Sequence, residues 1–329
     1  MAPRQVAWRP AGLSAAWVSH RLACAEQRTP PSSATRGSPD PDTNDVPSFW
    51  KWYVGNGAYG LSMTENPQSD EPRGPQFVDA DLRGARIVRS DLSDAVMRGV
   101  YLAGADIDGE IGGLRINGVE VPPLVEAELN RRFPGREGRR ANDPDGLREN
   151  WAVLERTWAA TLERVAQMSD GAVDVSVDGE WSFAQTLRHL VLATDAWLRG
   201  SILGVAQPFH PIGLPFAEYE TDGFDMSIFT ASMPSYEEVL DVRAGRVAMV
   251  RDYLATVTPE VLLETRPNPW APQSDVTVSG CLRVILDEEW EHHRYAVRDL
   301  DAIEARTCAS TDSSQAEFGP SMSKPPSGS

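Results

Sequence analysis

Two glutamates and two histidines stand close together near the C-terminal end of the chain, in EEWEHHRYAVRDL, residues 288 to 300. Glu289 and His293 are four residues apart, about one helical turn, so their side chains lie on one helix face. A carboxylate oxygen and an imidazole nitrogen are ligands that divalent metal ions accept. The pair indicates a metal site, and a buried hydrogen bond between the two side chains is the alternative that the spacing leaves open.

The apolar residues around this pair predict a helix over about 278–305. Its inner face carries Leu282, Leu286, Val297 and Leu300. Glu289 and His293 fall at the centre of that face, whereas Glu288 and His292 fall roughly 80 to 120 degrees away and are expected at the edge. Buried without partners, a carboxylate and an imidazole would each cost roughly a few kcal/mol. A metal ion would satisfy both.

A third ligand of the same kind occurs in WSFAQTLRHLVLATDAWL, residues 181 to 198. His189 shares a helix face with Ser182, Gln185, Ala193 and Ala196. Small residues leave room for a site. For His189 taken alone, a hydrogen-bonded core histidine is the alternative, but three inward ligands on two helices favour a metal.

Four amphipathic segments must position these residues. They run over about 144–168, from Ser182 to Leu203, from Ser235 to Val257, and over 278–305. Asp143 before Pro144 predicts the first helix start, and SFAQ and SYEE are capping boxes for the next two. We therefore expect a mainly α protein built on a four-helix bundle.

Arg243 interrupts the apolar stripe of the third segment, which is formed by Tyr236, Leu240, Val247 and Leu254. Its guanidinium is expected in the bundle interior or at its mouth. There it could bind a carboxylate on a substrate or cosubstrate. An ion pair with an acid such as Asp195, or with a neighbour of Glu289, is the alternative.

A different regularity covers residues 77–121. Apolar residues recur every five positions, at Phe77, Leu82, Ile87, Leu92, Met97, Leu102 and Ile107. A period of five fits a chain wound into square coils with an inward apolar ladder as its core. The segment ADLRGARIVRSDLSDAVMRGVYLAGADI resembles the pentapeptide-repeat family, a right-handed β-coil. About seven repeats make barely two coils, so we interpret the segment as an annex for packing rather than a partner-binding surface or a mimic of DNA.

Composition narrows the classes of function. The formal net charge of -17 argues against nucleic acid as a partner, because a phosphate-binding surface needs clustered Lys and Arg. Three widely spaced cysteines give neither a disulfide framework nor a cysteine-based zinc site, which favours a reducing cytoplasm. No apolar run reaches the length of a membrane helix, so no membrane partner is expected.

Residues 143–305 resemble the DinB-like family of metal-binding four-helix bundles, and LRHLV and EEWEHHRYAVRDL carry the likeness. The sequence is most similar to the branch that contains mycothiol-dependent maleylpyruvate isomerase, whose metal ligands are His, Glu and His. That set maps onto His189, Glu289 and His293. The resemblance implies a divalent metal, Zn in the first place, with Ni, Mn or Fe as alternatives.

The resemblance also implies an activity. Family members use low-molecular-weight thiols, so we expect a metal-dependent transferase or isomerase in which mycothiol or bacillithiol, as thiolate, attacks an electrophile. Arg243 would bind the cosubstrate, and a homodimer is compatible with such an enzyme. The alternative is a non-catalytic, stress-associated scaffold for metal or protein binding.

These inferences give an expected domain order. Residues 1–62 form a disordered or non-native extension, with natural translation starting at Met63, and residues 77–121 form the coil. A helix and linker occupy 122–142, the bundle 143–306, and a disordered tail 307–329.

Overall fold

The computed structural model describes residues 75–316, apart from 89, 217–218, 221–222 and 231. The chain divides into two compact units, one ending at Gly113 and the other containing everything from Leu114 onward. The predicted disordered head, the proposed start at Met63 and residues 317–329 lie outside the described residues. The division at Gly113 assigns the last part of the predicted coil, residues 114–121, to the helical unit.

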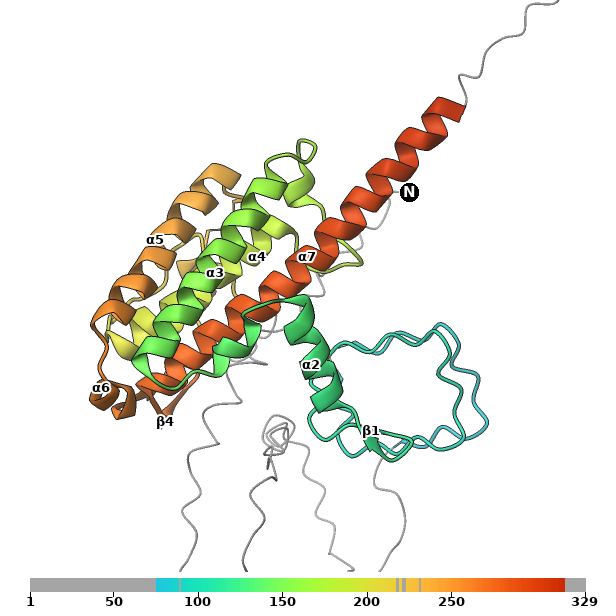
Figure 1. Ribbon diagram of the computed structural model, residues 1–329, viewed down its shortest axis with the longest axis horizontal. Helices are drawn as coiled ribbons and strands as arrows, with labels where there is room; N and C mark the ends of the chain where they lie inside the picture. The colour runs from blue at the N-terminus through green and yellow to red at the C-terminus, as the bar shows by residue number, and fades with distance from the viewer. Residues whose placement is uncertain (1–74, 89, 217–218, 221–222, 231, 317–329) are drawn as a thin grey trace, which may run out of the picture. The chain divides into compact units, whose positions relative to one another are not determined.

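The first unit is the predicted coil, traced as paired turns in Figure 1. Tight turns recur at ten-residue intervals, where the amides of Ala85, Ala95 and Ala105 donate to the carbonyls of Leu82, Leu92 and Leu102. The expected apolar core is not formed, because the ladder residues remain between 46% and 72% exposed. With so few coils, the inward side chains lack further turns on which to stack.

The second unit opens with a short hairpin and helix. Strands β1 (Arg115–Ile116) and β2 (Val119–Glu120) pair antiparallel, and α2 (Pro122–Arg132) follows. The predicted linker then forms a 3-10 helix, η2 (Arg136–Arg140).

Four long helices form the bundle, as predicted. They are α3 (Pro144–Val165), α4 (Phe183–Thr194), α5 (Tyr236–Thr256) and α7 (Val278–Ala316). Asp143 caps α3, and Ser182 and Ser235 form capping boxes with Gln185 and Glu238. Helix α3 packs against α5 and α7, and α4 packs against the same two, so α3 and α4 occupy opposite corners (Figure 1).

Helix α4 passes directly into a π-helical stretch, η4 (Asp195–Ile202). Between α5 and α7 lie α6 (Pro259–Leu263) and an antiparallel hairpin of β3 (Thr265–Asn268) and β4 (Ala271–Thr277). Thr277 then caps α7, since its hydroxyl oxygen accepts from the amide of Gly280 at 3.0 Å.

Helix α7 extends beyond the predicted end of the bundle. It continues to Ala316, through the first ten residues of the segment predicted as a disordered tail. Neither glycine nor proline occurs in this helix after Gly280, and the next pair that would stop it is Gly319 and Pro320. In the part of the chain that the structure describes, none of the helices combines the length and hydrophobicity needed to cross a bilayer.

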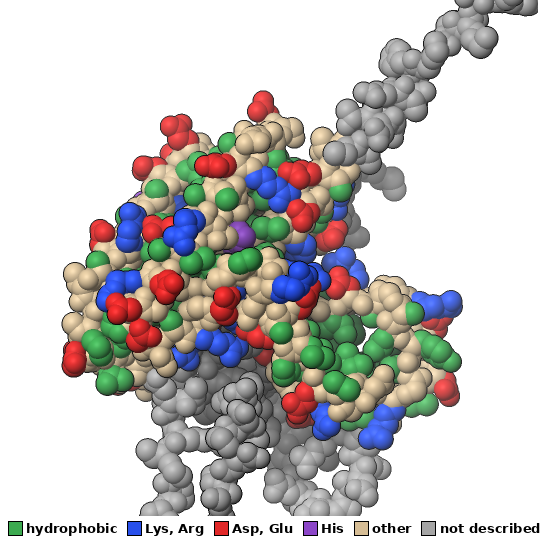
Figure 2. Space-filling view, in the orientation of Figure 1, with side chains coloured by type: hydrophobic (Ala, Val, Ile, Leu, Met, Phe, Trp, Pro, Cys, Tyr) green, Lys and Arg blue, Asp and Glu red, His purple; other side chains and the backbone are tan. Residues whose placement is uncertain are grey.

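The bundle core is apolar and closely filled. Trp197, Leu198 and Trp290 are all fully enclosed. A smaller aromatic cluster under the 204–234 loop contains Phe216, Tyr219, Phe224, Phe229 and Trp270. On the face of the bundle shown in Figure 2, acidic and basic side chains are interspersed.

Candidate metal centre

Helix α4 carries His189 in the interior, where the side chain is 0% exposed. Its Nδ1 lies 3.0 Å from the main-chain oxygen of Leu214 in the loop after η4. A carbonyl oxygen only accepts, so Nδ1 carries the proton and Nε2 presents its lone pair. The loop therefore fixes the tautomer that a metal ligand requires.

Helix α7 supplies Glu288 and His292, which are four residues apart and only 1% and 6% exposed. The Nδ1 of His292 lies 2.9 Å from the main-chain oxygen of Glu288, one turn earlier. The Oε2 of Glu288 lies 3.2 Å from that same nitrogen and 3.5 Å from the Nε2 of His189. One ligand atom from each of the three residues lies within 4.8 Å of the others.

Two atoms of this trio are buried without a hydrogen-bond partner among the described residues, the Nε2 of His189 and the Oε2 of Glu288. Each such atom loses its hydration without compensation, which costs roughly 1–3 kcal/mol. A divalent cation would accept both electron pairs at once. Two imidazole nitrogens and one carboxylate oxygen also match the three-ligand sets of catalytic zinc, which leave a further position open. The residues present fit the metal.

The titration behaviour of the trio follows from its burial. Burial lowers the pKa of His189, which keeps that imidazole neutral. Burial alone would raise the pKa of Glu288, but the two adjacent imidazoles outweigh it and leave the pKa below its ordinary value. For His292, burial opposes the charged form, and the interactions with Glu288 overcome burial and raise the pKa. The carboxylate is thus held ionised, the form that binds metal.

Glu289 and His293, the pair predicted from sequence, are not brought to His189. Glu289 forms a buried ion pair with Arg243 on α5, at 2.5 Å. The Nε2 of His293 lies 2.9 Å from the hydroxyl oxygen of Thr161 on α3. Burial lowers the pKa of His293 to about 4.

The face of α7 that meets His189 is thus one residue, or about 100 degrees, away from the face expected from sequence. Glu288 and His292 were expected at an edge, yet α7 packs against α4 and η4 as well as against α3 and η2, so this part of the helix is buried on both flanks. The sequence did hold a signal. Val284 and Ile285 precede Glu288 by four and three residues, and they are apolar on the supposed edge.

Arg243 does not lie at an open mouth. Its side chain is 6% exposed and one terminal nitrogen, Nη2, is committed to Glu289. The structure shows an ion pair, as in the second alternative, but the partner is Glu289 itself rather than Asp195 or a neighbour of Glu289. The role in binding a cosubstrate stays a prediction.

The loop that orients His189 is itself anchored. Arg188 donates from Nε to the oxygen of Ile212 at 2.9 Å, and the amide of Leu214 donates to the oxygen of Arg188 at 3.2 Å. Asp195, fully buried in the π-helix, accepts from the amide of His210 at 2.8 Å and from Arg246 at 2.6 Å. The loop is thus a wall that the bundle holds in place.

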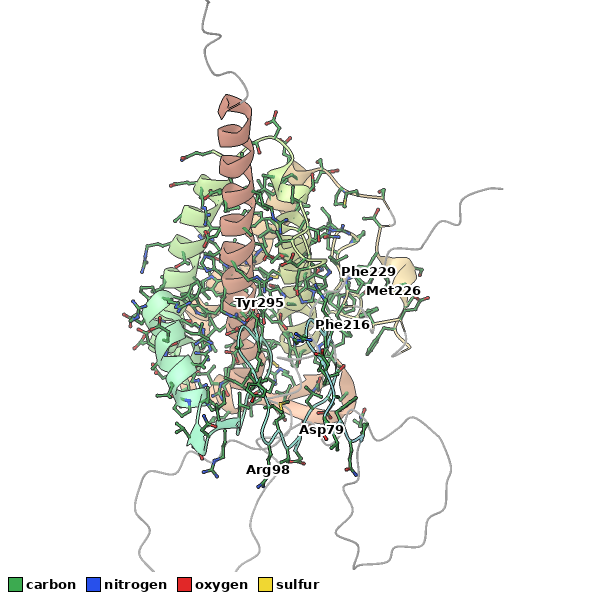
Figure 3. All side chains as sticks on the ribbon, turned by 90° about the vertical axis from the view of Figure 1, so that its right-hand side faces the viewer. Asp79, Arg98, Phe216, Met226, Phe229 and Tyr295 are labelled. Carbon is green, nitrogen blue, oxygen red and sulfur yellow. The ribbon has the colours of Figure 1, made fainter. Side chains whose placement is uncertain are left out.

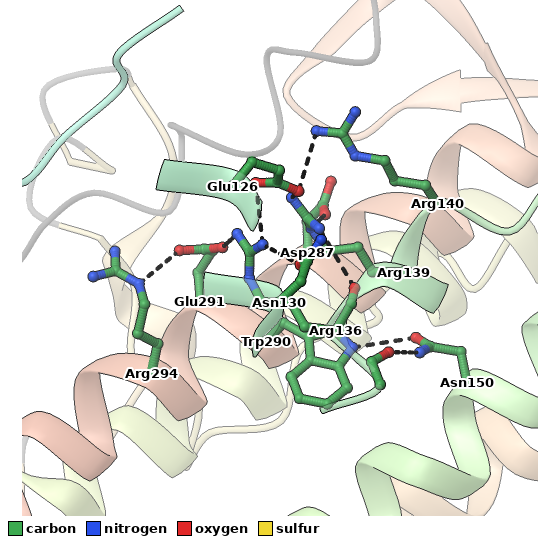
Figure 4. A network of polar contacts seen from close by, with 11 residues as sticks. Glu126, Asn130, Arg136, Arg139, Arg140, Asn150, Asp287, Trp290, Glu291 and Arg294 are labelled. Atoms are coloured by element: carbon green, nitrogen blue, oxygen red, sulfur yellow. Dashed lines mark hydrogen bonds and ion pairs between the residues drawn. The ribbon is translucent and has the colours of Figure 1, made fainter. Parts of the chain in front are cut away.

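A second buried network flanks the trio and was missed from sequence (Figure 4). Arg136 reaches Glu291 at 2.6 Å, and Arg139 reaches Asp287 at 3.0 Å. Asn150 accepts from the indole of Trp290 at 3.2 Å. These contacts with α7 alternate along the helix with Glu288 and His292, so they fix the rotation of the helix that carries the ligands. In sequence, the arginines looked like part of a polar linker.

Aromatic rings cover the outer side of the trio. The ring of Trp181 lies 4.6 Å from that of His189 and stacks on His292 at 6.1 Å. Tyr295, midway along α7 in Figure 3, meets His292 edge-on at 6.1 Å. Beside them a hollow is lined by Glu180, Trp181, Thr186, His292, Tyr295 and Asp299.

Comparisons with known proteins agree with this architecture. Residues 153–296 match the model of the DinB superfamily, and residues 76–109 match pentapeptide repeats in eight copies. Neither the curated proteins nor the solved structures gave a significant match to the chain. His189, Glu288 and His292 all lie within the first match. The helical bundle therefore contains a segment similar to the DinB superfamily, and the segment before it is similar to pentapeptide repeats.

Proposed function

We propose that His189, Glu288 and His292 bind a divalent metal ion, Zn in the first place, and that the protein is a metal-dependent transferase or isomerase using a low-molecular-weight thiol. The observation that carries this proposal is the convergence of three buried ligand atoms within 4.8 Å. Two of these atoms lack any other partner in the described structure. The match of residues 153–296 to the DinB superfamily supports the same assignment.

The protein side chains have separable tasks in this proposal. His189 is held as the neutral tautomer by the Leu214 carbonyl, and Glu288 is held ionised by its two imidazole neighbours. Trp181 and the 204–234 loop restrict water at the site. A metal ion bound by three protein ligands supplies an open position that stabilises a thiolate near neutral pH.

The chemistry that follows is addition of sulfur to an electrophilic carbon. The thiol proton leaves to solvent and a C–S bond forms. In a transfer, the bond from that carbon to its leaving group breaks. In an isomerisation, the C–S bond breaks again and the thiol is returned. Mycothiol and bacillithiol are the thiols we propose, and a reducing cytoplasm is the compartment in which they would be available.

Metal analysis of the purified full chain tests the first half of the proposal. We expect about one divalent ion per chain in the wild type and in Glu149→Gln, a matched control at an exposed site on α3. His189→Ala and Glu288→Gln should be metal-poor. A wild type that remains metal-free after incubation with Zn, Ni, Mn and Fe salts would contradict the assignment.

Thiol consumption tests the second half. Metal-loaded protein is mixed with each thiol and 1-chloro-2,4-dinitrobenzene, from which the thiolate displaces chloride to give a coloured thioether. We expect a rate above the uncatalysed reaction that disappears with Glu288→Gln. For isomerisation, cis-to-trans conversion of an unsaturated acid is followed at constant thiol. Loaded protein that is inert with both thiols in both assays would reject the catalytic role while leaving the metal site intact.

A further inference from the structure

Two arginines of η2, Arg136 and Arg139, hold the part of α7 that carries two of the proposed metal ligands (Figure 4). Their side chains are only 3% and 7% exposed. Arg136 lies 2.6 Å from Glu291, and Arg139 lies 3.0 Å from Asp287. We call these two arginines the arginine clamp.

The acids that the arginine clamp holds are direct chain neighbours of two ligands. Asp287 precedes Glu288 and Glu291 precedes His292, so acids and ligands repeat at the same four-residue spacing. One residue corresponds to about 100 degrees of rotation, so the face with the acids and the face with the ligands turn together. His189, the third ligand, stands on a different helix, α4. The clamp therefore sets how Glu288 and His292 are aimed at it.

The segment that carries the arginine clamp has a fixed seat against α3. A Cβ added at Gly138 would lie 2.5 Å from the Nδ2 of Asn150. Asn150 is held at both ends, because its Nδ2 donates to the oxygen of Gly135 at 2.7 Å and its Oδ1 accepts from Trp290 at 3.2 Å. Glu126 on α2 pairs with both arginines, at 3.1 and 2.7 Å. A shift of η2 is thus transmitted to α7.

Small rotations of α7 matter for a metal site. Side-chain atoms about 5–6 Å from a helix axis move by about 1 Å when the helix rotates by about 10 degrees. Metal–ligand distances tolerate deviations of only about 0.2 Å. Groups that orient metal ligands from outside change metal affinity by about 10–100-fold when they are replaced. Loosening the clamp removes no ligand, so we expect the low end of this range.

We propose that Arg136 and Arg139 are positioning residues that align Glu288 and His292 with His189. The effect on metal affinity rests on the proposed function, whereas the alignment of the three side chains does not. Coupling between two sites is reciprocal, so a clamp that raises metal affinity about tenfold is itself stabilised by bound metal by the same factor. Metal binding and the seating of η2 on α7 support each other.

Zinc affinity of the full chain, measured by competition with a chromophoric chelator, tests the positioning role. Arg139→Gln should weaken zinc binding about tenfold, and Arg139→Lys, which keeps the charge, should recover part of the loss. Gly138→Ala should act like Arg139→Gln, although every arginine and acid remains. Arg164→Gln is the matched control, because Arg164 pairs with Asp301 and Glu304 further along α7. Its zinc affinity should stay within about twofold of the wild type.

The alignment can also be measured without metal. The ring centroids of His189 and His292 lie 4.8 Å apart, which should give a nuclear Overhauser contact in chelator-treated protein. Arg139→Gln should weaken this contact, and Arg164→Gln should leave it unchanged. A retained contact between the stacked rings of Phe209 and Trp270 shows that each variant is folded.

Amide exchange of the wild type tests the reciprocal effect. The amides of Arg136, Gly138 and Ala141 are hydrogen-bonded within their own segment and exchange when it opens. Zinc should slow their exchange about tenfold, and should change that of Leu262 and Glu264, at α6, by less than about twofold. This measurement decides the question even if Arg139→Gln fails to fold, and equal exchange of η2 with and without bound zinc would contradict the coupling.

The outcomes separate the two proposals. Zinc affinity within about twofold of the wild type in both Arg139→Gln and Gly138→Ala would overturn the positioning role and leave the proposed metal site intact. A wild type that binds no zinc, but whose contact between His189 and His292 is lost in Arg139→Gln, would support the positioning role and reject the proposed function.

Discussion

Helix α7 carries the same two residue types twice at the same spacing, Glu288 with His292 and Glu289 with His293. The two pairs have different surroundings in the bundle. The first pair faces α4 and meets another imidazole, that of His189. The second faces α5 and α3 and meets Arg243 and Thr161. The residue types and their spacing are identical, so the difference comes entirely from the neighbouring helix.

The contrast is one of charge compensation. Glu289 has its counter-charge within the chain, in a buried guanidinium. Glu288 faces two imidazoles, of which burial keeps that of His189 neutral, whereas the interactions with Glu288 raise the pKa of His292. A buried carboxylate without a full counter-charge is costly, and an added cation removes that cost. The pair whose carboxylate faces imidazoles rather than a guanidinium is the one that we propose for metal.

The largest expected effect is on stability. Glu289→Gln leaves Arg243 buried without its partner, and breaking such a pair costs about 3–5 kcal/mol. Glu288→Gln in chelator-treated protein should lower the free energy of unfolding by less, about 1 kcal/mol, because the amide oxygen can still accept from the imidazole of His292. Urea unfolding of both variants measures the difference. Equal destabilisation would remove the distinction between the two faces.

Zinc affinity, in contrast to stability, should depend more on the pair of Glu288 and His292 than on the pair of Glu289 and His293. His292→Gln should weaken zinc binding on the order of 100-fold, about 2.7 kcal/mol, because a ligand is lost. His293→Gln, one residue away, should leave affinity within about threefold. Competition with a chromophoric chelator gives both constants. A larger loss for His293→Gln would restore the pairing expected from sequence.

The pH dependence of the free energy of unfolding should reveal the lowered pKa of His293. Burial lowers its folded-state pKa to about 4 from an ordinary value of 6.5. Between these values the unfolded chain takes up a proton that the folded protein does not, so the stability that this group contributes is lost as pH falls. From about pH 8 to about pH 5 the loss is about 2 kcal/mol. In chelator-treated His293→Gln the decline should be shallower by this amount, and parallel curves would contradict the expectation.

The smallest expected effect on stability concerns His293, the imidazole of the second pair. Thr161→Val removes the hydroxyl that lies 2.9 Å from His293 and should lower the free energy of unfolding by about 1 kcal/mol. Zinc affinity should be unchanged, because Thr161 contacts the pair that does not reach His189. Chemical denaturation and the same chelator competition check both statements, and weakened zinc binding would tie the two faces together.

Much of the fold followed from local signals. Asp143, Ser182 and Ser235 mark helix starts because their side chains satisfy the first free amides, and the structure places each where predicted. The recurrence of five residues also identified the pentapeptide segment. Burial of its ladder did not follow, because burial depends on how many coils stack and not on the repeat itself.

The site was predictable only in part. His189 was identified because it stands on a helix face of small residues in an otherwise apolar helix. The choice between neighbouring pairs on α7 failed because that helix is buried nearly all round, so an apolar stripe no longer marks a single inward direction. Arg136 and Arg139 were assigned to a linker, since their burial depends on acids more than 145 residues away, such as Asp287 and Glu291.

The sequence by itself determined the four helices, their caps, the repeat period and the ligand types, because these depend on hydrogen bonds and spacings within a few residues. Only the tertiary structure decided that Glu288 and His292, rather than Glu289 and His293, meet His189. The rotation of α7 about its axis is fixed by contacts from η2, α3, α4 and η4 at once, together with the ion pair from Arg243 on α5. A change of one residue turns the helix face by about 100 degrees, which no local pattern in a fully buried helix can resolve.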